Sequence, residues 1–205
     1  AGVVGIFTLL SRIAGLARDV AVGYFFGTGA AADAFFVAFR IPNLLRRFVA
    51  EGAMSIALIP VFTDYVTNRS RAETEEAMSA VATLMALVLL VLTAAGVVFA
   101  PELTALFAPG FAADAEKFRL TIELTRRVFP FIFLVSMVAL ATGVLHSVRH
   151  FAAPALAPVL LNIAIIAAAL LSGRFAEPVL ALAWGVIVGG VVQILIQIPP
   201  IARAG

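Results

Sequence analysis

Residues 11–19 read SRIAGLARD, and they place Arg12, Arg18 and Asp19 inside an apolar segment, residues 3–26. A membrane-spanning helix needs about 20 mostly apolar residues, and this segment is long enough to be one. An arginine at the centre of a bilayer costs about 3 kcal/mol on insertion scales. We therefore expect these charges to face protein or water rather than lipid.

A second apolar segment, residues 34–62, repeats the pattern. It contains FRIPNLLRRFVAEG, which brings Arg40, Arg46, Arg47 and Glu51 into or beside the hydrocarbon. Arg40 and Arg47 are seven residues apart and share a helix face, and Glu51 follows Arg47 at an ion-pair spacing. The first two helices are therefore predicted to present cationic stripes.

The composition is that of an integral membrane protein. The chain is 63% hydrophobic and 13% charged, with a mean hydropathy of +1.11. A soluble domain is about half apolar and about a quarter charged. Cysteine is absent, which excludes disulfides and thiolate metal sites within these residues.

The apolar runs predict an all-α, polytopic membrane helix bundle. Four further segments carry uninterrupted apolar cores of spanning length. Because the chain starts without methionine and stops directly after an apolar run, we expect it to be part of a longer protein. The six predicted spans are residues 3–26, 34–62, 79–100, 128–148, 151–172 and 179–198.

The basic residues are thirteen arginines and one lysine, Lys117. Around Arg18, Arg46 and Arg47 the cations outnumber the carboxylates, and a surplus of positive charge at membrane depth predicts an anionic ligand. A diphosphate would suit it, since guanidinium groups bind phosphate oxygens in a bidentate manner. The alternative is that the charges pair among themselves or extend to the headgroups. Asp33, which precedes the run AFFVAF, is predicted to cap its helix.

Several polar and small residues inside the later spans have simpler interpretations. Asn162, Gln193 and Gln197 are expected to form hydrogen bonds between helices, and Gly185 and Gly189 to allow close helix packing.

Signals for catalysis are weak. His146 and His150 have a spacing that suits a metal on a helix, but no third ligand lies nearby in the sequence. No phosphate-binding loop, Ser/His/Asp set or paired-carboxylate site is recognisable. These residues therefore argue against ATP hydrolysis or covalent catalysis within this chain.

Three stretches together resemble a known family: SRIAGLARD, FGTGAAADAFFVAFRIPNLLRRFVAEGA and IPVF. They are similar to the N-terminal signature of the MurJ (MviN-type) lipid II flippases, which belong to the multidrug/oligosaccharidyl-lipid/polysaccharide exporter superfamily. The resemblance is dense over residues 11–62, and over residues 63–205 it rests on the number and spacing of the spans.

The resemblance implies a multi-pass transporter of the bacterial cytoplasmic (inner) membrane. It would move lipid II, the undecaprenyl-diphosphate-linked disaccharide-pentapeptide used for peptidoglycan, from the inner to the outer leaflet by alternating access. Residues 1–205 would form its N-terminal six-helix lobe. The implied partners are lipid II, membrane lipids and the C-terminal lobe of the same protein, and not nucleic acid. No cofactor is implied, while coupling to the membrane potential or to a monovalent ion is left open.

The resemblance also implies roles for individual residues. Arg18 and Arg46 would lie in the central cavity, and Glu51 falls at a gate position. The implied substrate-binding residues are Arg12, Arg18, Asp19, Asp33, Arg46 and Arg47.

Other functions remain open at this point. A sister exporter could carry another polyprenyl-linked oligosaccharide, whereas a cationic drug would prefer an anionic cavity. A membrane enzyme acting on polyprenyl phosphates would require a cluster of acid/base or metal-binding residues. A structural scaffold would leave the arginines inside the spans unexplained.

Overall fold

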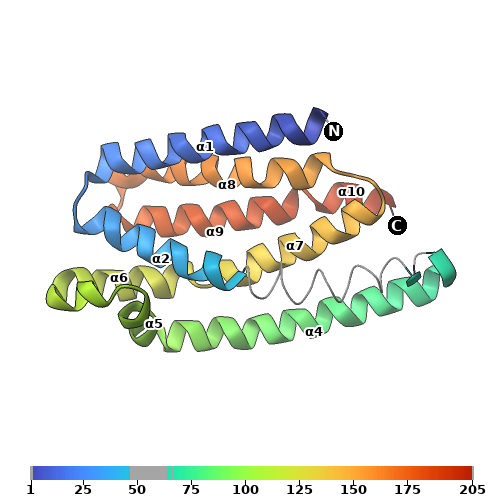
Figure 1. Cartoon of the computed structure of the whole chain (residues 1–205), viewed down its shortest axis with the longest axis horizontal. Coiled ribbons are helices and arrows are strands. Elements are labelled where there is room, and N and C mark those ends of the chain that lie inside the picture. Colours follow the sequence, from blue (N-terminus) through green and yellow to red (C-terminus); the bar gives the residue numbers. More distant parts are fainter. Residues whose placement is uncertain (1, 47–63, 66, 205) are drawn as a thin grey trace.

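The computed structural model describes residues 2–46, 64–65 and 67–204, and every regular element in this part of the chain is a helix (Figure 1). This confirms the all-α prediction. The α-helices labelled in Figure 1 are α1 (Gly2–Phe26), α2 (Ala30–Arg46), α4 (Arg71–Val98), α5 (Ala100–Phe107), α6 (Ala115–Val128), α7 (Phe131–Ser147), α8 (Ala152–Leu171), α9 (Leu180–Leu195) and α10 (Ile198–Ala204). Two short 3₁₀ turns, η2 (Pro109–Ala113) and η3 (Ser172–Arg174), follow α5 and α8.

Helix α8 lies between α1 and α9, and these are the two most extensive helix pairings of the bundle (Figure 1). Small residues bring α9 close to α8. A Cβ atom added at Gly185 would lie 2.6 Å from the Cβ of Ala168, and one added at Gly189 would lie 2.7 Å from Cδ1 of Leu161. The predicted role of these two glycines in close helix packing is confirmed.

A second group of helices, α2, α6 and α7, packs beside the first. Helix α2 lies mainly against α6, and α7 lies against α9. The core that they share with α8 and α9 is apolar and buried, as expected for side chains at native packing density. Its largest members are Phe35, Leu124, Phe131, Ile165 and Leu182.

Helix α4 runs along the outside of the bundle (Figure 1). It begins with a capping box, in which the Ser70 hydroxyl accepts from the backbone N–H of Glu73 and the Glu73 carboxylate accepts from that of Ser70. Only Leu89 and Gly96 of α4 are buried among the described residues. Gly96 lies directly under the ring of Phe129, where an added Cβ would meet ring carbons, so this point fixes α4 against the corner between α6 and α7.

Four described helical segments are long and apolar enough to cross a membrane: Arg71–Val98, Ala115–Ser147, Ala152–Arg174 and Leu180–Arg203. Helix α1 has 25 residues and carries three charges, and α2 is described only to Arg46. The count of six spans therefore stays a prediction.

Two details of the sequence analysis differ from the structure. Asp33 is not the cap of α2, because the helix already begins at Ala30 and the backbone N–H of Asp33 donates to the carbonyl of Gly29. Three alanines, which are strong helix formers, precede it and extend the helix. The link before the fourth predicted span is also largely helical: α6 begins at Ala115 and continues through a turn into α7.

Candidate functional site

Arg18 is the centre of a polar network inside the bundle. Its Nε and Nη2 donate to Oδ1 of Asp19 at 2.9 and 2.7 Å, and its Nη1 donates to Oδ1 of Asn162 at 3.0 Å. Its guanidinium carbon also lies 5.5 Å from the centre of the Phe39 ring. Partners from α1, α8 and α2 thus surround the Arg18 side chain, which is only 19% exposed.

The ion pair with Asp19 bears on the two alternatives that the sequence left open. A surplus of cations was expected around Arg18, Arg46 and Arg47; Arg18 pairs with its neighbour along the chain, as the alternative had it, while Arg47 lies outside the described residues. Asp19 itself is half exposed, with 49% of its side chain accessible. The carboxylate is therefore reachable from outside the network, and the guanidinium has further N–H donors beyond these three bonds.

Asn162 connects α8 to α1 in two ways. Its Oδ1 accepts from Arg18, and its Nδ2 lies 3.4 Å from the carbonyl oxygen of Ser11 as a long hydrogen bond. Gly15 faces the amide: a Cβ added there would lie 3.8 Å from Nδ2. An amide inside an apolar helix is satisfied by a neighbouring helix, which confirms the predicted interhelical hydrogen bond at Asn162.

The other two predicted intramembrane amides also bond between helices. Nε2 of Gln193 donates to the carbonyl of Ala157 on α8 at 2.8 Å. Gln197 accepts from the hydroxyl of Thr142 on α7 at 3.1 Å. Both glutamines are buried, so these bonds fix the relative positions of α7, α8 and α9.

Arg12 lines an open pocket of about 450 Å³ between α1, α7 and α8. It is exposed, and it has no carboxylate partner in the part of the chain that the structure describes. The other wall includes His146, whose ring lies 5.1 Å from that of Phe151. The pocket is lined by Thr8, Ser11, Arg12, Thr142, His146, Phe151, Pro154, Ala155 and Pro158.

Asp33 pairs with a lysine of α6 and not with an arginine of the predicted substrate site. Its Oδ2 accepts from Nζ of Lys117 on α6 at 2.6 Å. The ammonium also lies 4.0 Å from the centre of the Phe111 ring. Asp33 therefore fastens the start of α2 to α6 and does not join the network of Arg18 and Asp19.

Three predicted site residues cannot be placed. Arg46 ends the described part of α2, and nothing is described of its side chain, while Arg47 and Glu51 lie outside the described residues. Among the residues that are described, no group of three His, Cys, Asp or Glu side chains is arranged to hold a metal ion.

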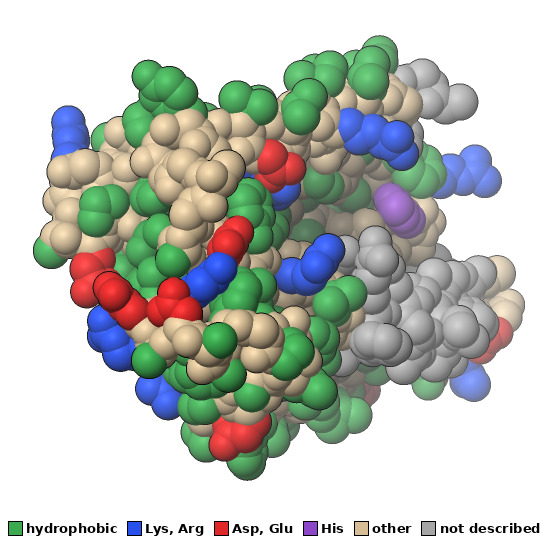
Figure 2. All heavy atoms as spheres, turned by 60° about the vertical axis from the view of Figure 1, so that its left-hand side comes forward, with side chains coloured by type: hydrophobic (Ala, Val, Ile, Leu, Met, Phe, Trp, Pro, Cys, Tyr) green, Lys and Arg blue, Asp and Glu red, His purple; other side chains and the backbone are tan. Residues whose placement is uncertain are grey.

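The charged side chains lie on a hollowed face of the bundle. Figure 2 shows basic and acidic side chains together along a hollow, with hydrophobic side chains around it. The pocket of Arg12 and the network of Arg18 share α1 and α8, so both belong to the side of the bundle that these helices form.

Sequence reasoning missed two contributors to this arrangement. Lys117 lies between two predicted spans and was given no partner, although it pairs with Asp33, and His146 was considered only as a metal ligand, although it lines the pocket of Arg12. A signal for Asn162 existed, because it is the only polar side chain in the run from Ala152 to Leu171.

Comparison with known proteins identifies the family of this chain. The family model described as lipid II flippase MurJ matches residues 22–205. The chain belongs to the lipid II flippase MurJ family. As a member of this family it is a multi-pass protein of the bacterial inner membrane, which agrees with its long apolar helices.

Individual relatives support the family assignment. The chain is 44% identical over 198 residues to the lipid II flippase MurJ of Burkholderia cenocepacia, covering 96% of this chain and 38% of the relative. It is 41% identical over 206 residues to the probable lipid II flippase MurJ of Haemophilus influenzae, covering 97% of this chain and 40% of the relative. The chain thus spans about two fifths of the length of these curated relatives.

A solved structure has the same fold. It is described as lipid II flippase MurJ in an inward closed conformation, and it matches with a TM-score of 0.81 and 29% sequence identity. The match covers 99% of this chain and 42% of that one.

Proposed function

We propose that this chain is the N-terminal lobe of a transporter that flips lipid II from the inner to the outer leaflet by alternating access. In this proposal the chain is a transporter rather than an enzyme, and a C-terminal lobe of the same protein completes the cavity. The family assignment supports the substrate class, because the matched relatives are named for lipid II flipping.

The observation that carries the proposal is the position of Arg18. A charged side chain at membrane depth is costly, so it is retained where it has a function. Arg18 is only partly compensated: Asp19 and Asn162 orient its guanidinium, and part of the side chain remains accessible. A diphosphate offers oxygens on both phosphates, and the planar guanidinium matches such oxygens better than an ammonium does.

The proposed substrate contacts extend beyond Arg18. Arg12, in its open pocket, supplies a cation without a carboxylate partner among the described residues. Asp19 orients Arg18, and Asp33 orients the start of α2 through Lys117. Arg46 and Arg47 are proposed as further phosphate contacts and Glu51 as a gate residue, on the resemblance alone.

The test is complementation by the full-length transporter in cells depleted of their own lipid II flippase. We expect Arg18→Ala to abolish growth at normal protein levels, because the variant loses the oriented guanidinium. The matched control is Arg71→Ala. Arg71 is also an arginine in an ion pair with a carboxylate, that of Glu75 at 2.8 Å, but its side chain is 75% exposed at the start of α4.

A second measurement separates lipid II from other polyprenyl-linked glycans. Purified protein in liposomes should move lipid II across the bilayer and should not move an undecaprenyl-diphosphate that carries an unrelated oligosaccharide. Normal growth with Arg18→Ala would contradict the proposed role of the arginine. Equal transport of both lipids would instead favour the sister-exporter alternative.

A further inference from the structure

The segment between α4 and α7 joins two apolar helices, so we expect it to lie near one end of the hydrocarbon. The apolar helix α4 ends at Val98, and the apolar helix α7 begins at Phe131. Between them, α5, η2 and α6 form a compact unit at one end of the bundle (Figure 1). Since two helices of spanning length meet at this unit, we infer that it lies at the level of the lipid headgroups.

A pocket of about 560 Å³ opens on this unit. It combines apolar walls with three guanidinium groups and one carboxylate. Its lining residues are Pro101, Phe118, Arg119, Ile122, Glu123, Arg126 and Arg127.

The charges of this pocket are not balanced. Nη2 of Arg127 donates to Oε1 of Glu123 at 2.7 Å, so one cation is neutralised. Arg119 and Arg126 are exposed and have no carboxylate partner among the described residues. They are seven residues apart, which places them on the same face of α6. Two unpaired guanidinium groups therefore point to a ligand with negative charge.

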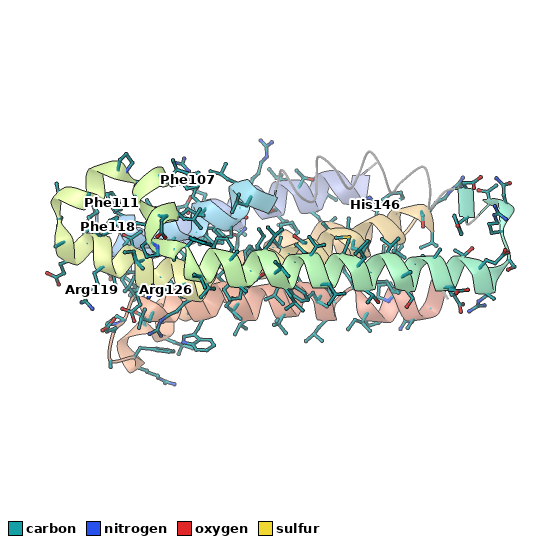
Figure 3. The ribbon with its side chains drawn as sticks, turned by 90° about the horizontal axis from the view of Figure 1, so that it is seen from below. Phe107, Phe111, Phe118, Arg119, Arg126 and His146 are labelled. Carbon is teal, nitrogen blue, oxygen red and sulfur yellow. The ribbon has the colours of Figure 1, made fainter. Side chains whose placement is uncertain are left out.

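A neighbouring basic residue, Lys117, already has its partners within the chain. Lys117 pairs with Asp33 and lies over the ring of Phe111, which fastens α6 to α2. The backbone that carries Arg119 and Arg126 is thus held in place before any ligand binds. Figure 3 shows both arginines at the end of the bundle that also carries Phe107, Phe111 and Phe118, far along the long axis from His146.

Exposed apolar side chains on and next to α5, the helix that supplies Pro101 to the pocket, indicate that the ligand is a lipid. Phe99 is 55% exposed and Leu106 is 72% exposed, both in or next to α5. Exposed apolar side chains of this kind are suited to contact acyl chains, and basic pockets near the headgroups bind anionic lipid headgroups.

We propose that the pocket of Arg119 and Arg126 binds the phosphate of an anionic membrane phospholipid, with the acyl chains lying along the exposed side chains of α5. The two guanidinium groups donate hydrogen bonds to the phosphate oxygens, while Glu123 keeps Arg127 oriented at the edge of the pocket. This site is separate from the network of Arg18 and independent of what the transporter carries.

The experiment uses the full-length protein in detergent and measures the binding of phosphatidylglycerol by native mass spectrometry. Each basic residue near an anionic headgroup contributes about a fivefold change in affinity, so the double variant Arg119→Gln with Arg126→Gln should bind phosphatidylglycerol about 25-fold more weakly. Binding of zwitterionic phosphatidylcholine should be unchanged. Because both arginines are exposed, the variant should unfold at the same temperature as the parent.

Arg174→Gln is the matched control, since Arg174 is an exposed arginine at the end of η3, which follows α8 at the same end of the bundle. It should leave phosphatidylglycerol binding unchanged. An unchanged affinity of the double variant, or an equal loss with Arg174→Gln, would overturn the proposal. Displacement of phosphatidylglycerol by an excess of inorganic phosphate would show that the pocket binds free phosphate, and would overturn the lipid assignment as well.

Discussion

Arg18 of α1 and Asn162 of α8 are 144 residues apart in the chain, and Nη1 of the arginine donates to Oδ1 of the amide at 3.0 Å. This bond connects the helix that carries the proposed substrate contacts to the helix at the centre of the bundle. The position of the guanidinium is therefore a property of the α1–α8 pair and not of α1 alone.

Asn162→Ala should weaken this connection. Hydrogen bonds between membrane helices contribute about 0.6 to 1.7 kcal/mol, so we expect the free energy of unfolding to fall by about 1 kcal/mol. Lipid II transport per folded molecule should also fall, because Arg18 loses one of its orienting partners. Gln193→Ala is the control, since Gln193 bonds α9 to α8 without touching Arg18. It should lose similar stability and keep its transport rate; equal rates in the two variants would contradict the orienting role.

Arg18→Lys tests whether the shape of the cation matters as well as its charge. A lysine ammonium is a compact point charge. It lacks the planar set of N–H donors with which the guanidinium binds Asp19 and Asn162 at the same time. We expect transport in liposomes to fall roughly tenfold while some activity remains. A lysine variant as fast as the parent would show that charge alone is sufficient.

A charge swap tests whether Asp33 acts through Lys117. Asp33→Asn and Lys117→Met should each lower transport several-fold, because the 2.6 Å ion pair that fastens α2 to α6 is lost. Asp33→Lys combined with Lys117→Asp restores an ion pair and should recover most of this loss. If the swapped protein is present at normal levels but inactive, Asp33 contacts the substrate directly.

The ion pair of Arg71 with Glu75 is the control for this swap. It is exposed on both sides, at 75% and 63%, and exposed pairs contribute about 0 to 1 kcal/mol. Glu75→Gln should therefore leave transport and protein levels unchanged.

Cysteine labelling tests whether the pocket of Arg12 is hydrated. The chain has no cysteine, so Ser11→Cys in the pocket and Val91→Cys on α4 provide thiols without background from these residues. Val91 is 69% exposed on the apolar helix α4. A thiol reacts as the thiolate, which needs water, so Ser11→Cys should react with a soluble maleimide at least about tenfold faster. Equal rates would show that the pocket is closed to water.

Much of the bundle follows from local sequence patterns. Uninterrupted apolar runs mark α4, α8 and α9, and the spacing of Gly185 and Gly189 shows that α9 approaches another helix closely. These features depend on neighbouring residues, so periodicity and side-chain size are sufficient to predict them.

The contacts of the charged side chains could not be predicted in the same way. Arg18 and Asp19 are adjacent and leave the helix in directions about 100° apart, so their pairing depends on how a long side chain bends inside the bundle. Lys117 meets Asp33 across 84 residues, and only the packing of α2 on α6 brings them together. Residues far apart in the chain are positioned by the tertiary fold, which hydropathy does not specify.

Helix α4 has 28 residues, of which Leu89 and Gly96 are the buried ones among those described. Many of its other apolar side chains, such as Leu84 and Val91, are exposed, and the membrane interior accepts Leu, Ile, Val and Phe almost equally. Over evolutionary time these positions should exchange freely among apolar residues. Gly96 should resist replacement, because the ring of Phe129 occupies the space of any larger side chain. The exposed positions of α4 should therefore vary in sequence among relatives, whereas Gly96 should remain glycine.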